Sequence, residues 1–340
     1  MDEIVDVLII GGGPCGLAAA IEATKSNLSH LVLEKGSITE SIRRYPRKMR
    51  FFSTAENIEI GGIPFPISGV KANRDEALQY YRKVAGFYHL NFRLFSEVES
   101  IEKKPVPAEA NAIFHVTTIK GEVFRARNVV IATGYFDLPR KLGVPGEDLP
   151  HVSHYYDEPF RYSYSKVVIV GGGNSAVEAA LELYRHDVDV TIVHRGGDLR
   201  QTVKYWLIPD VKNRIREGKI KAVFNAELAA ITPENSIFEN TQTSGQIHIP
   251  ADFVFLLVGY VPDAKLLLQA GAHLNENLVP VYNPRTFETN VDGLYVCGTV
   301  LAGIHTEKVF IENGRNHAKA IIDSIAGRPV RMVEDLIVRM

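Results

Sequence analysis

Short apolar runs, each closed by a glycine-rich turn, form the clearest pattern along this chain. Predominantly apolar runs at 4–10 and at 166–170 lead directly into three consecutive glycines, at 11–13 and at 171–173. A helical pattern of apolar positions follows each turn, and similar runs and helical patterns alternate along the chain. This alternation predicts an α/β fold built on parallel sheets.

The two glycine turns predict two dinucleotide-binding sites. In a strand–turn–helix unit the first glycine permits the tight turn, and the second lets a pyrophosphate approach the backbone. The third small residue lets the helix pack on the strand. The amide groups at the start of each helix then face the phosphates. The residues expected to bind nucleotide are Gly11, Gly13, Pro14 and Gly16 in the first turn and Gly171, Gly173, Asn174, Ser175 and Ala176 in the second.

The residues beyond each turn indicate which nucleotide each site takes. Glu34 ends the next apolar run after the first turn, and a carboxylate there suits free ribose hydroxyls but repels a phosphate. The matching run at 190–193 leads instead to His194, Arg195 and then Arg200. Two arginines can pair with the additional phosphate of NADPH; the alternative is ordinary solvated charge. We therefore expect FAD at the first site and NADPH at the second.

The second glycine turn lies between two further apolar runs that end in glycine, at residues 127–134 and 252–259. This nested order predicts two Rossmann-like dinucleotide-binding domains, with the NADPH domain inserted into the FAD domain. We place the FAD-binding domain at residues 1–135 and 251–340 and the NADPH-binding domain at residues 136–250.

Length, charge and cysteine content narrow the class of protein. The 340 residues suffice for two domains with cores of their own. A net charge of −2 leaves no basic field for nucleic acid, and no apolar run has the length of a membrane span. We expect no signal peptide, because the first strand begins so early, and no metal, because the histidines lack ligand spacing. Two cysteines form no disulfide framework, which fits a reducing cytoplasm.

Over its whole length the chain resembles the flavoproteins that bind two dinucleotides. The order and spacing of its nucleotide-binding motifs are similar to those of the low-molecular-weight thioredoxin reductase group. The closing FAD motif of that group usually ends in Gly-Asp, and the aspartate holds the ribityl chain of the flavin. Here the motif reads Gly298-Thr299, and a threonine hydroxyl can hydrogen-bond without charge assistance. The resemblance implies that Gly298 and Thr299 contact FAD and that the protein is a homo-oligomer, a dimer.

The dithiol of the thioredoxin reductases is missing from the chain. They carry a Cys-x-x-Cys pair ahead of the second glycine turn, whereas residues 154–157 here read His-Tyr-Tyr-Asp, which excludes the usual dithiol relay. Three relatives of the same fold remain: ferredoxin or flavodoxin NADP reductases, flavin monooxygenases and bacillithiol disulfide reductases. The segments that look like the last of these are residues 13–17, 51–54, 152–156, 204–206 and 309–314.

The chain is identified on these segments as a member of the bacillithiol disulfide reductase family. The resemblance implies a cytoplasmic, FAD-dependent enzyme that passes hydride from NADPH through flavin to a low-molecular-weight disulfide, bacillithiol disulfide. The alternative is a thioredoxin-reductase-like ferredoxin or flavodoxin NADP reductase, which needs no thiol. A flavin monooxygenase and a non-catalytic flavin redox sensor are further alternatives. None of these functions requires nucleic acid or a membrane as a partner.

Cys15 stands in the first turn of the expected helix, where relatives of this fold usually have alanine. Positive partial charge at a helix start favours thiolate over thiol, so we expect a lowered pKa. A single reactive thiol can run a mixed-disulfide cycle, which makes Cys15 the candidate catalytic residue. The alternative is that Cys15 is merely small enough for a crowded loop. Cys297 lies among apolar residues and is expected in the core, although a redox pair with Cys15 stays open.

A further helix start is expected at residues 306–313, with Glu307 in its first turn. The resemblance implies that this helix points its N-terminus at the flavin. Its positive end would stabilise negative charge on the reduced flavin, and Glu307 would partly offset this.

Overall fold

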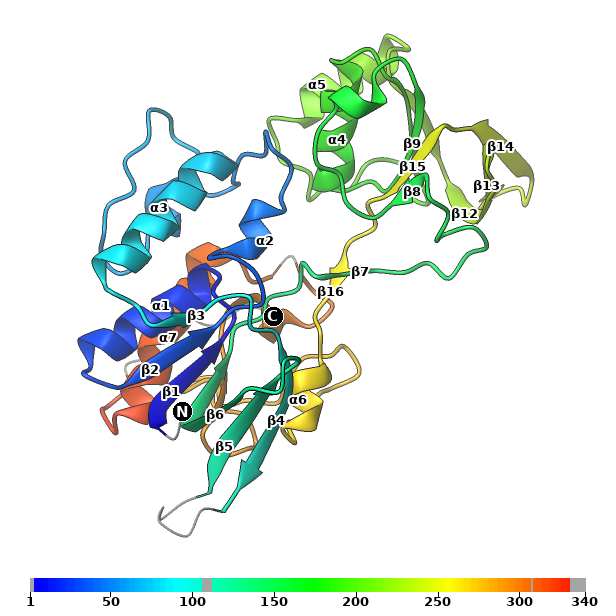
Figure 1. Ribbon diagram of the computed structural model, residues 1–340. Coiled ribbons are helices and arrows are strands. Elements are labelled where there is room, and N and C mark those ends of the chain that lie inside the picture. The colour runs from blue at the N-terminus through cyan, green and yellow to red at the C-terminus, as the bar shows by residue number, and fades with distance from the viewer. Residues whose placement is uncertain (1–2, 106–111, 307, 331–340) are drawn as a thin grey trace. The chain divides into compact units, whose positions relative to one another are not determined.

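The computed structural model describes residues 3–105, 112–306 and 308–330. The chain forms two compact units, and the second is inserted into the first (Figure 1). The first unit consists of Met1–Arg44, Arg50–Leu138 and Tyr260–Met340, and the second consists of Tyr45–Met49 and Pro139–Gly259.

A seven-stranded sheet forms the centre of the first unit. Its order is β3-β2-β1-β6-β5-β4, and β17 pairs with the end of β6. The strands β3, β2, β1, β6 and β17 pair in parallel, whereas β5 pairs antiparallel with β4 and with the first half of β6. The strands are β1 Ile4–Ile10, β2 His30–Leu33, β3 Phe92–Arg93, β4 Val98–Lys104, β5 Ile113–Thr118, β6 Val123–Ile131 and β17 Leu294–Val296.

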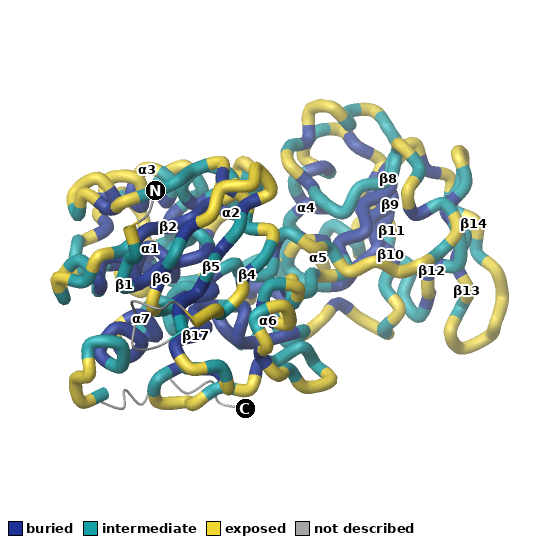
Figure 2. Tube along the Cα trace, turned by 60° about the horizontal axis from the view of Figure 1, so that its bottom comes forward, coloured by how far each residue is buried: buried dark blue, intermediate teal, exposed yellow. Residues whose placement is uncertain are grey.

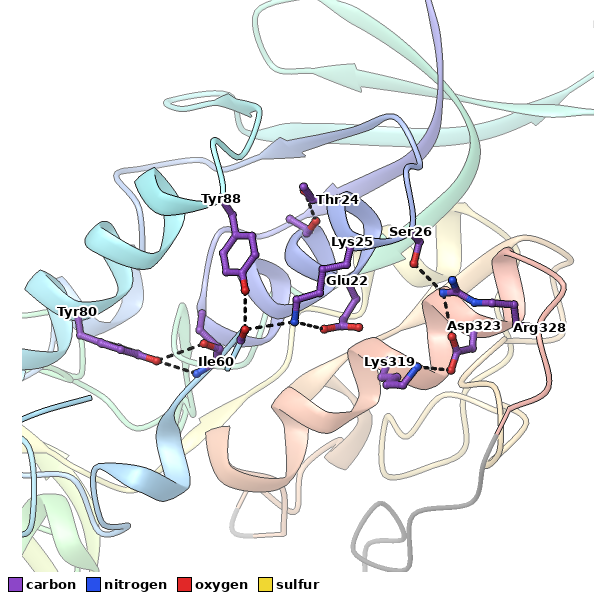
Figure 3. Close-up of polar contacts among 12 residues, drawn as sticks. Glu22, Thr24, Lys25, Ser26, Ile60, Tyr80, Tyr88, Lys319, Asp323 and Arg328 are labelled. Atoms are coloured by element: carbon purple, nitrogen blue, oxygen red, sulfur yellow. Dashed lines mark hydrogen bonds and ion pairs between the residues drawn. The ribbon is translucent and has the colours of Figure 1, made fainter. Parts of the chain in front are cut away.

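Two long helices of the first unit, α1 and α7, pack against each other. Consecutive alanines at 18–20 lie buried on α1, and such small side chains let two helices approach closely. Figure 3 shows how polar contacts join the two helices at their C-terminal ends: Arg328 donates to Ser26 at 2.6 Å and pairs with Asp323 at 2.9 Å. The helices are α1 Pro14–Lys25, α2 Glu40–Arg43, α3 Arg74–Phe87, α6 Lys265–Gln269 and α7 Ile311–Ile325, with 3₁₀ turns η1 Glu56–Ile58 and η3 Gly298–Ala302.

The second unit has a five-stranded parallel sheet in the order β11-β10-β9-β15-β8 and a separate antiparallel sheet, β12-β13-β14. In both units the central strands are buried along most of their length (Figure 2). Apolar residues on both faces are typical of parallel strands covered on each side. The elements are β8 Val152–Ser153, η2 Phe160–Tyr162, β9 Lys166–Val170, α4 Asn174–Tyr184, β10 Asp189–His194, α5 Ile208–Arg216, β11 Lys221–Phe224, β12 Ala226–Ile231, β13 Asn235–Asn240, β14 Gln246–Pro250 and β15 Phe253–Leu256.

The borders of the two units differ from the domain borders expected from the sequence. We placed the end of the inserted domain at residue 250, but β15 pairs with β9 and β8 and belongs to the second unit, which extends to Gly259. Val254, Phe255 and Leu256 are buried there. The connecting segments, β7 Leu138–Pro139 and β16 Tyr260–Val261, pair with each other.

Two sets of strands also depart from the expected parallel pairing. One is the β4–β5 edge of the first sheet, and the other is the whole β12–β14 sheet; both are antiparallel.

Among the described helices, none combines the length and the apolar character that a membrane span requires. The described residues also contain no cluster of three His, Cys, Asp or Glu side chains arranged to hold a metal ion.

Candidate functional site

The first glycine turn, between β1 and α1, is closed on one side and open on the other. Gly11 has a φ of +111°, and a Cβ there would lie 2.5 Å from the carbonyl oxygen of Ala132. A Cβ at Gly16 would lie 1.9 Å from the Gly11 oxygen, so glycine lets α1 start close to β1. A Cβ at Gly13, by contrast, meets no described atom within 4 Å. Exposed backbone beside Pro14, the first residue of α1, is what a pyrophosphate needs.

Glu34 holds this turn from the end of β2. Its Oε2 accepts a hydrogen bond from the Gly12 amide at 2.7 Å, and its Oε1 accepts one from the Gly36 amide at 2.8 Å. Burial raises the pKa of the Glu34 carboxyl, and the two backbone amides oppose that rise. Each carboxylate oxygen has a further lone pair, so the fixed carboxylate can still accept from a ribose hydroxyl. The surroundings of Glu34 therefore fit a nucleotide with free ribose hydroxyls.

The second glycine turn, between β9 and α4, repeats the geometry of the first. A Cβ at Gly171 would lie 2.4 Å from the carbonyl oxygen of Leu257 and 3.3 Å from the Cβ of the fully buried Ala176. A Cβ at Gly173 meets only the Cδ of Arg200, at 3.9 Å. The turn is again tight toward the sheet and open beside the helix start.

The side chain above the second turn is a histidine instead of a carboxylate. A Cβ at Gly172 would lie 2.6 Å from ring atoms of His194, just as a Cβ at Gly12 would lie against Glu34. Burial lowers the pKa of His194, and the charges of Arg195 and Arg200 lower it further. An imidazole with a lowered pKa, flanked by two arginines, thus stands where the first unit has a carboxylate.

Both arginines of the second turn are exposed. Arg200 is fixed through its backbone, because its amide donates to the Gly172 oxygen at 2.8 Å. Neither the Arg195 nor the Arg200 guanidinium makes a hydrogen bond or ion pair with the part of the chain that the structure describes. Two guanidinium groups free to pair beside an open glycine turn can bind a phosphate in bidentate fashion.

Asn174 and Ser175 begin helix α4 at this turn. The Asn174 side chain ties the turn to the following loop: its Oδ1 accepts from the Lys204 amide at 2.7 Å, and its Nδ2 donates to the Thr202 oxygen at 3.2 Å. Ser175 is exposed. The loop is held in turn by a partly buried ion pair of 2.5 Å between Lys204 and Glu178. Burial raises the pKa of the Glu178 carboxyl, against the effect of Lys204.

The sulfur of Cys15 is enclosed by glycines from two distant segments of the first unit. A Cβ at Gly298 would lie 2.8 Å from Cys15 Sγ, and one at Gly314 would lie 2.9 Å from it. Burial raises the pKa of the Cys15 thiol to about 12. Our expectation of a lowered pKa is therefore wrong, because the loss of water outweighs a helix-start charge worth about 0.3–1 kcal/mol. These crowded surroundings also fit the alternative that a small side chain is needed here.

Cys297 is buried, as expected, and lies beside Cys15. Its thiol donates to the backbone oxygens of Cys15 at 3.7 Å and Gly314 at 3.9 Å. Burial raises the pKa of the Cys297 thiol well above its usual range, and Cys15 adds to the effect. Both cysteines are free thiols.

The closing Gly298-Thr299 motif opens η3 next to Cys15. Thr299 Oγ1 would lie 3.5 Å from a Cβ at Gly134, so its hydroxyl lies near the end of β6. The Gly298 amide donates to Nδ1 of His317, a buried residue of α7, at 3.2 Å. Sequence reasoning missed His317, which belongs to no recognised motif.

Helix α7 begins at Ile311, later than the start expected near residue 306. Its first turn carries Glu312, which accepts a hydrogen bond of 2.5 Å from the Ser53 hydroxyl. Glu307, which we expected in that first turn, lies outside the described residues. The Ser53–Glu312 contact was also missed, although both residues lie in segments that carried the family resemblance.

Comparison with known proteins agrees with this geometry. Residues 8–298 match the family described as "Pyridine nucleotide-disulphide oxidoreductase". "Bacilliredoxin reductase Bdr" of Bacillus subtilis (strain 168) is 39% identical over 322 residues, which cover 94% of this chain and 97% of that protein.

Solved structures of similar proteins extend this result. "Bacillithiol Disulfide Reductase Bdr (YpdA)" from Staphylococcus aureus matches with a TM-score of 0.89 at 38% identity, covering 96% of this chain and 99% of that one. The protein of the same title from Bacillus cereus gives a TM-score of 0.90 at 38% identity and covers 96% and 100%. A T. acidophilum thioredoxin reductase, at 23% identity and a TM-score of 0.76, shares the fold.

These matches confirm the predicted fold class, an oxidoreductase activity, and FAD and a pyridine nucleotide as cofactors. The chain belongs to the pyridine nucleotide-disulphide oxidoreductase family and, within it, to the bacillithiol disulfide reductase group that its sequence resembles.

Proposed function

We propose that this protein is an NADPH-dependent flavoprotein reductase of a low-molecular-weight disulfide, with FAD in the first unit and NADPH in the second. The observation that carries the proposal is the repeated glycine turn, which has a buried carboxylate above it in the first unit and a histidine with two arginines in the second. Similar solved structures are titled bacillithiol disulfide reductases, so bacillithiol disulfide is the substrate we propose.

The cofactors are assigned by the groups available around each turn. In the first unit, the open backbone at Gly13 would face the pyrophosphate, Glu34 the ribose hydroxyls, and Thr299 the ribityl chain. In the second unit, Arg195 and Arg200 would pair with the additional phosphate of NADPH. When bound, NADPH and FAD supply the two electrons that disulfide reduction requires.

Cys15 is the sulfur that we propose to exchange with the substrate. Its thiolate attacks one sulfur of the disulfide, so that a mixed disulfide forms on Cys15 and one substrate thiol leaves. Uptake of two electrons and two protons then releases the second substrate thiol and restores the Cys15 thiol. With a pKa of about 12, Cys15 is protonated at neutral pH while its sulfur is buried. Attack therefore needs a state of the site that hydrates the sulfur or places positive charge beside it.

The burial of Cys15 also favours a second candidate function, a ferredoxin or flavodoxin NADP reductase, because that activity needs no thiolate. Several curated relatives carry the name "Ferredoxin--NADP reductase", among them that of Nitrobacter hamburgensis at 33% identity. The name "Bacilliredoxin reductase" of the Bacillus subtilis relative points to a third acceptor, a small redox protein. For the assembly we propose a homodimer in the cytoplasm, where free thiols such as Cys15 and Cys297 persist.

Anaerobic stopped-flow reoxidation distinguishes these acceptors. The protein is reduced with one equivalent of NADPH and mixed in turn with bacillithiol disulfide, glutathione disulfide, ferredoxin, flavodoxin and oxidised bacilliredoxin. We expect bacillithiol disulfide to restore the oxidised flavin spectrum fastest. Fast reoxidation by ferredoxin or flavodoxin, with none by any disulfide, would replace the proposal by the second candidate.

A further inference from the structure

His317 is a buried titratable residue that the proposed chemistry does not use. Its side chain is 0% exposed, and its ring stacks on Phe287 with the centroids 4.3 Å apart and an interplanar angle of 17°. Its Nδ1 lies 3.2 Å from the amide nitrogen of Gly298. Because an amide always donates, Nδ1 must be the acceptor, and the ring proton is therefore on Nε2.

The other ring nitrogen shows that His317 does more than fill space. Its Nε2 is buried and has no hydrogen-bond partner within the described part of the chain. A buried donor without a partner destabilises a protein, and an apolar ring would stack on Phe287 without that penalty. The imidazole provides a hydrogen-bond acceptor for the Gly298 amide, which a phenyl ring cannot provide.

Gly298 is the residue whose position needs such an acceptor. Its φ is +77°, and a Cβ would lie 2.8 Å from both Cβ and Sγ of Cys15. Glycine is thus required for the close approach, but it has no side chain of its own to anchor the turn. The hydrogen bond to His317 is the anchor, and the next residue, Thr299, carries the hydroxyl assigned to the flavin.

Helix α7 brings both elements of this arrangement to Cys15. Gly314 lies close to the Cys15 sulfur, and His317 follows three residues later on the same helix, which places the two on one face. We propose that His317 is a positioning residue: its Nδ1 holds the Gly298 amide and thereby fixes Thr299 and the wall of the Cys15 site. The inference rests on the proposed function for the role of Thr299, but the hydrogen bond itself can be tested without turnover.

Two substitutions separate the acceptor from the ring. His317→Asn keeps an acceptor oxygen at the position of Nδ1 but loses the ring. His317→Phe keeps the ring on Phe287 but loses the acceptor. The readouts are amide hydrogen exchange at Gly298 and the dissociation constant for FAD. We expect His317→Phe to raise both roughly tenfold, as the loss of one buried hydrogen bond does, and His317→Asn to stay close to the wild type.

Equal losses in both variants would overturn the proposal, because the ring would then act by packing alone. Wild-type exchange and FAD affinity in His317→Phe would overturn it as well. If His317→Phe does not fold, the comparison of His317→Asn with His317→Gln decides, since glutamine places the same amide one carbon further out. Retention by Asn with loss by Gln supports the proposal, and equal behaviour of the two contradicts it. If ferredoxin proves to be the acceptor, the proposed function fails, but the exchange result stands.

Discussion

Cys297 donates its thiol hydrogen to the backbone carbonyl oxygen of Cys15, with 3.7 Å between Sγ and O. The two cysteines are therefore neighbours, but this hydrogen bond runs from the Cys297 side chain to the Cys15 backbone. Both sulfurs are buried, and burial raises both pKa values. The site thus holds two protonated thiols at neutral pH, which bears directly on how reactive Cys15 is.

Cys15 should be almost inert toward alkylation in the native protein. With a pKa of about 12 instead of the usual value near 8.5, the thiolate population at neutral pH falls by about three orders of magnitude. In a Cys297→Ala background, where Cys15 is the one remaining thiol, we expect iodoacetamide to react roughly a thousandfold slower with native than with urea-unfolded protein. Equal rates in the two states would show that the sulfur is hydrated and the high pKa is wrong.

The double substitution Arg195→Ala with Arg200→Ala should weaken NADPH and leave NADH nearly unaffected. Each charge-assisted contact to the additional phosphate is worth about 1.5–3 kcal/mol, so we expect the KM for NADPH to rise tenfold or more. Arg216→Ala with Lys219→Ala removes the same charge from exposed positions of the second unit and serves as the control. An unmutated enzyme that uses NADH and NADPH equally well would refute this assignment of the two arginines.

Glu34→Ala should loosen the first glycine turn and release FAD. The substitution leaves the Gly12 and Gly36 amides without their acceptor, a loss of about 2–4 kcal/mol in the free energy of unfolding. Glu34→Gln keeps the size and one carbonyl oxygen, so its effect should be smaller. Flavin content after gel filtration and the thermal midpoint measure the two effects. Full flavin retention in Glu34→Ala would mean that Glu34 does not hold the nucleotide.

The protein should become less stable as the pH falls, and His317 should account for part of this loss. Burial lowers the pKa of His317 from its usual 6.5 to about 4. The unfolded chain therefore binds a proton between pH 6.5 and 4 that the folded chain refuses, and stability is full above pH 6.5 and lost as the pH falls. From pH 7 to pH 5 this one residue should account for about 2 kcal/mol. Urea unfolding at both pH values measures it.

His317→Asn is the matched comparison for that measurement, because it removes this titration while the other histidines stay unchanged. Its loss of stability between pH 7 and pH 5 should be smaller than that of the wild type by the same amount. Identical losses in the two proteins would mean that His317 titrates normally in the folded state.

Local signals in the sequence were sufficient for the central elements of the fold. The strands β1 and β9 have the bounds read from their apolar runs, because each run and its glycine turn lie within a few residues. The strand β15 was assigned to the wrong unit, since an apolar run looks the same whichever sheet it joins. The choice of neighbouring strands is made by tertiary packing, which no local pattern encodes.

The site was predictable to the same extent. Glu34 and His194 were found because their distances from the glycine turns are fixed by the strand–turn–helix unit. The burial of Cys15 could not be predicted, because the enclosing residues, Gly298 and Gly314, come from the opposite end of the chain. His317 escaped for the same reason: its role exists only once α7 packs on α1.

The most direct test of the central claim is single-turnover reoxidation of NADPH-reduced wild type and Cys15→Ala by bacillithiol disulfide. Alanine is small enough for the space between Gly298 and Gly314, so FAD binding and reduction by NADPH should be unchanged. If the sulfur carries the exchange, reoxidation of the variant should be slower by at least roughly a hundredfold. Reoxidation of Cys15→Ala at the wild-type rate would contradict the account and show that the disulfide is reduced without this thiol.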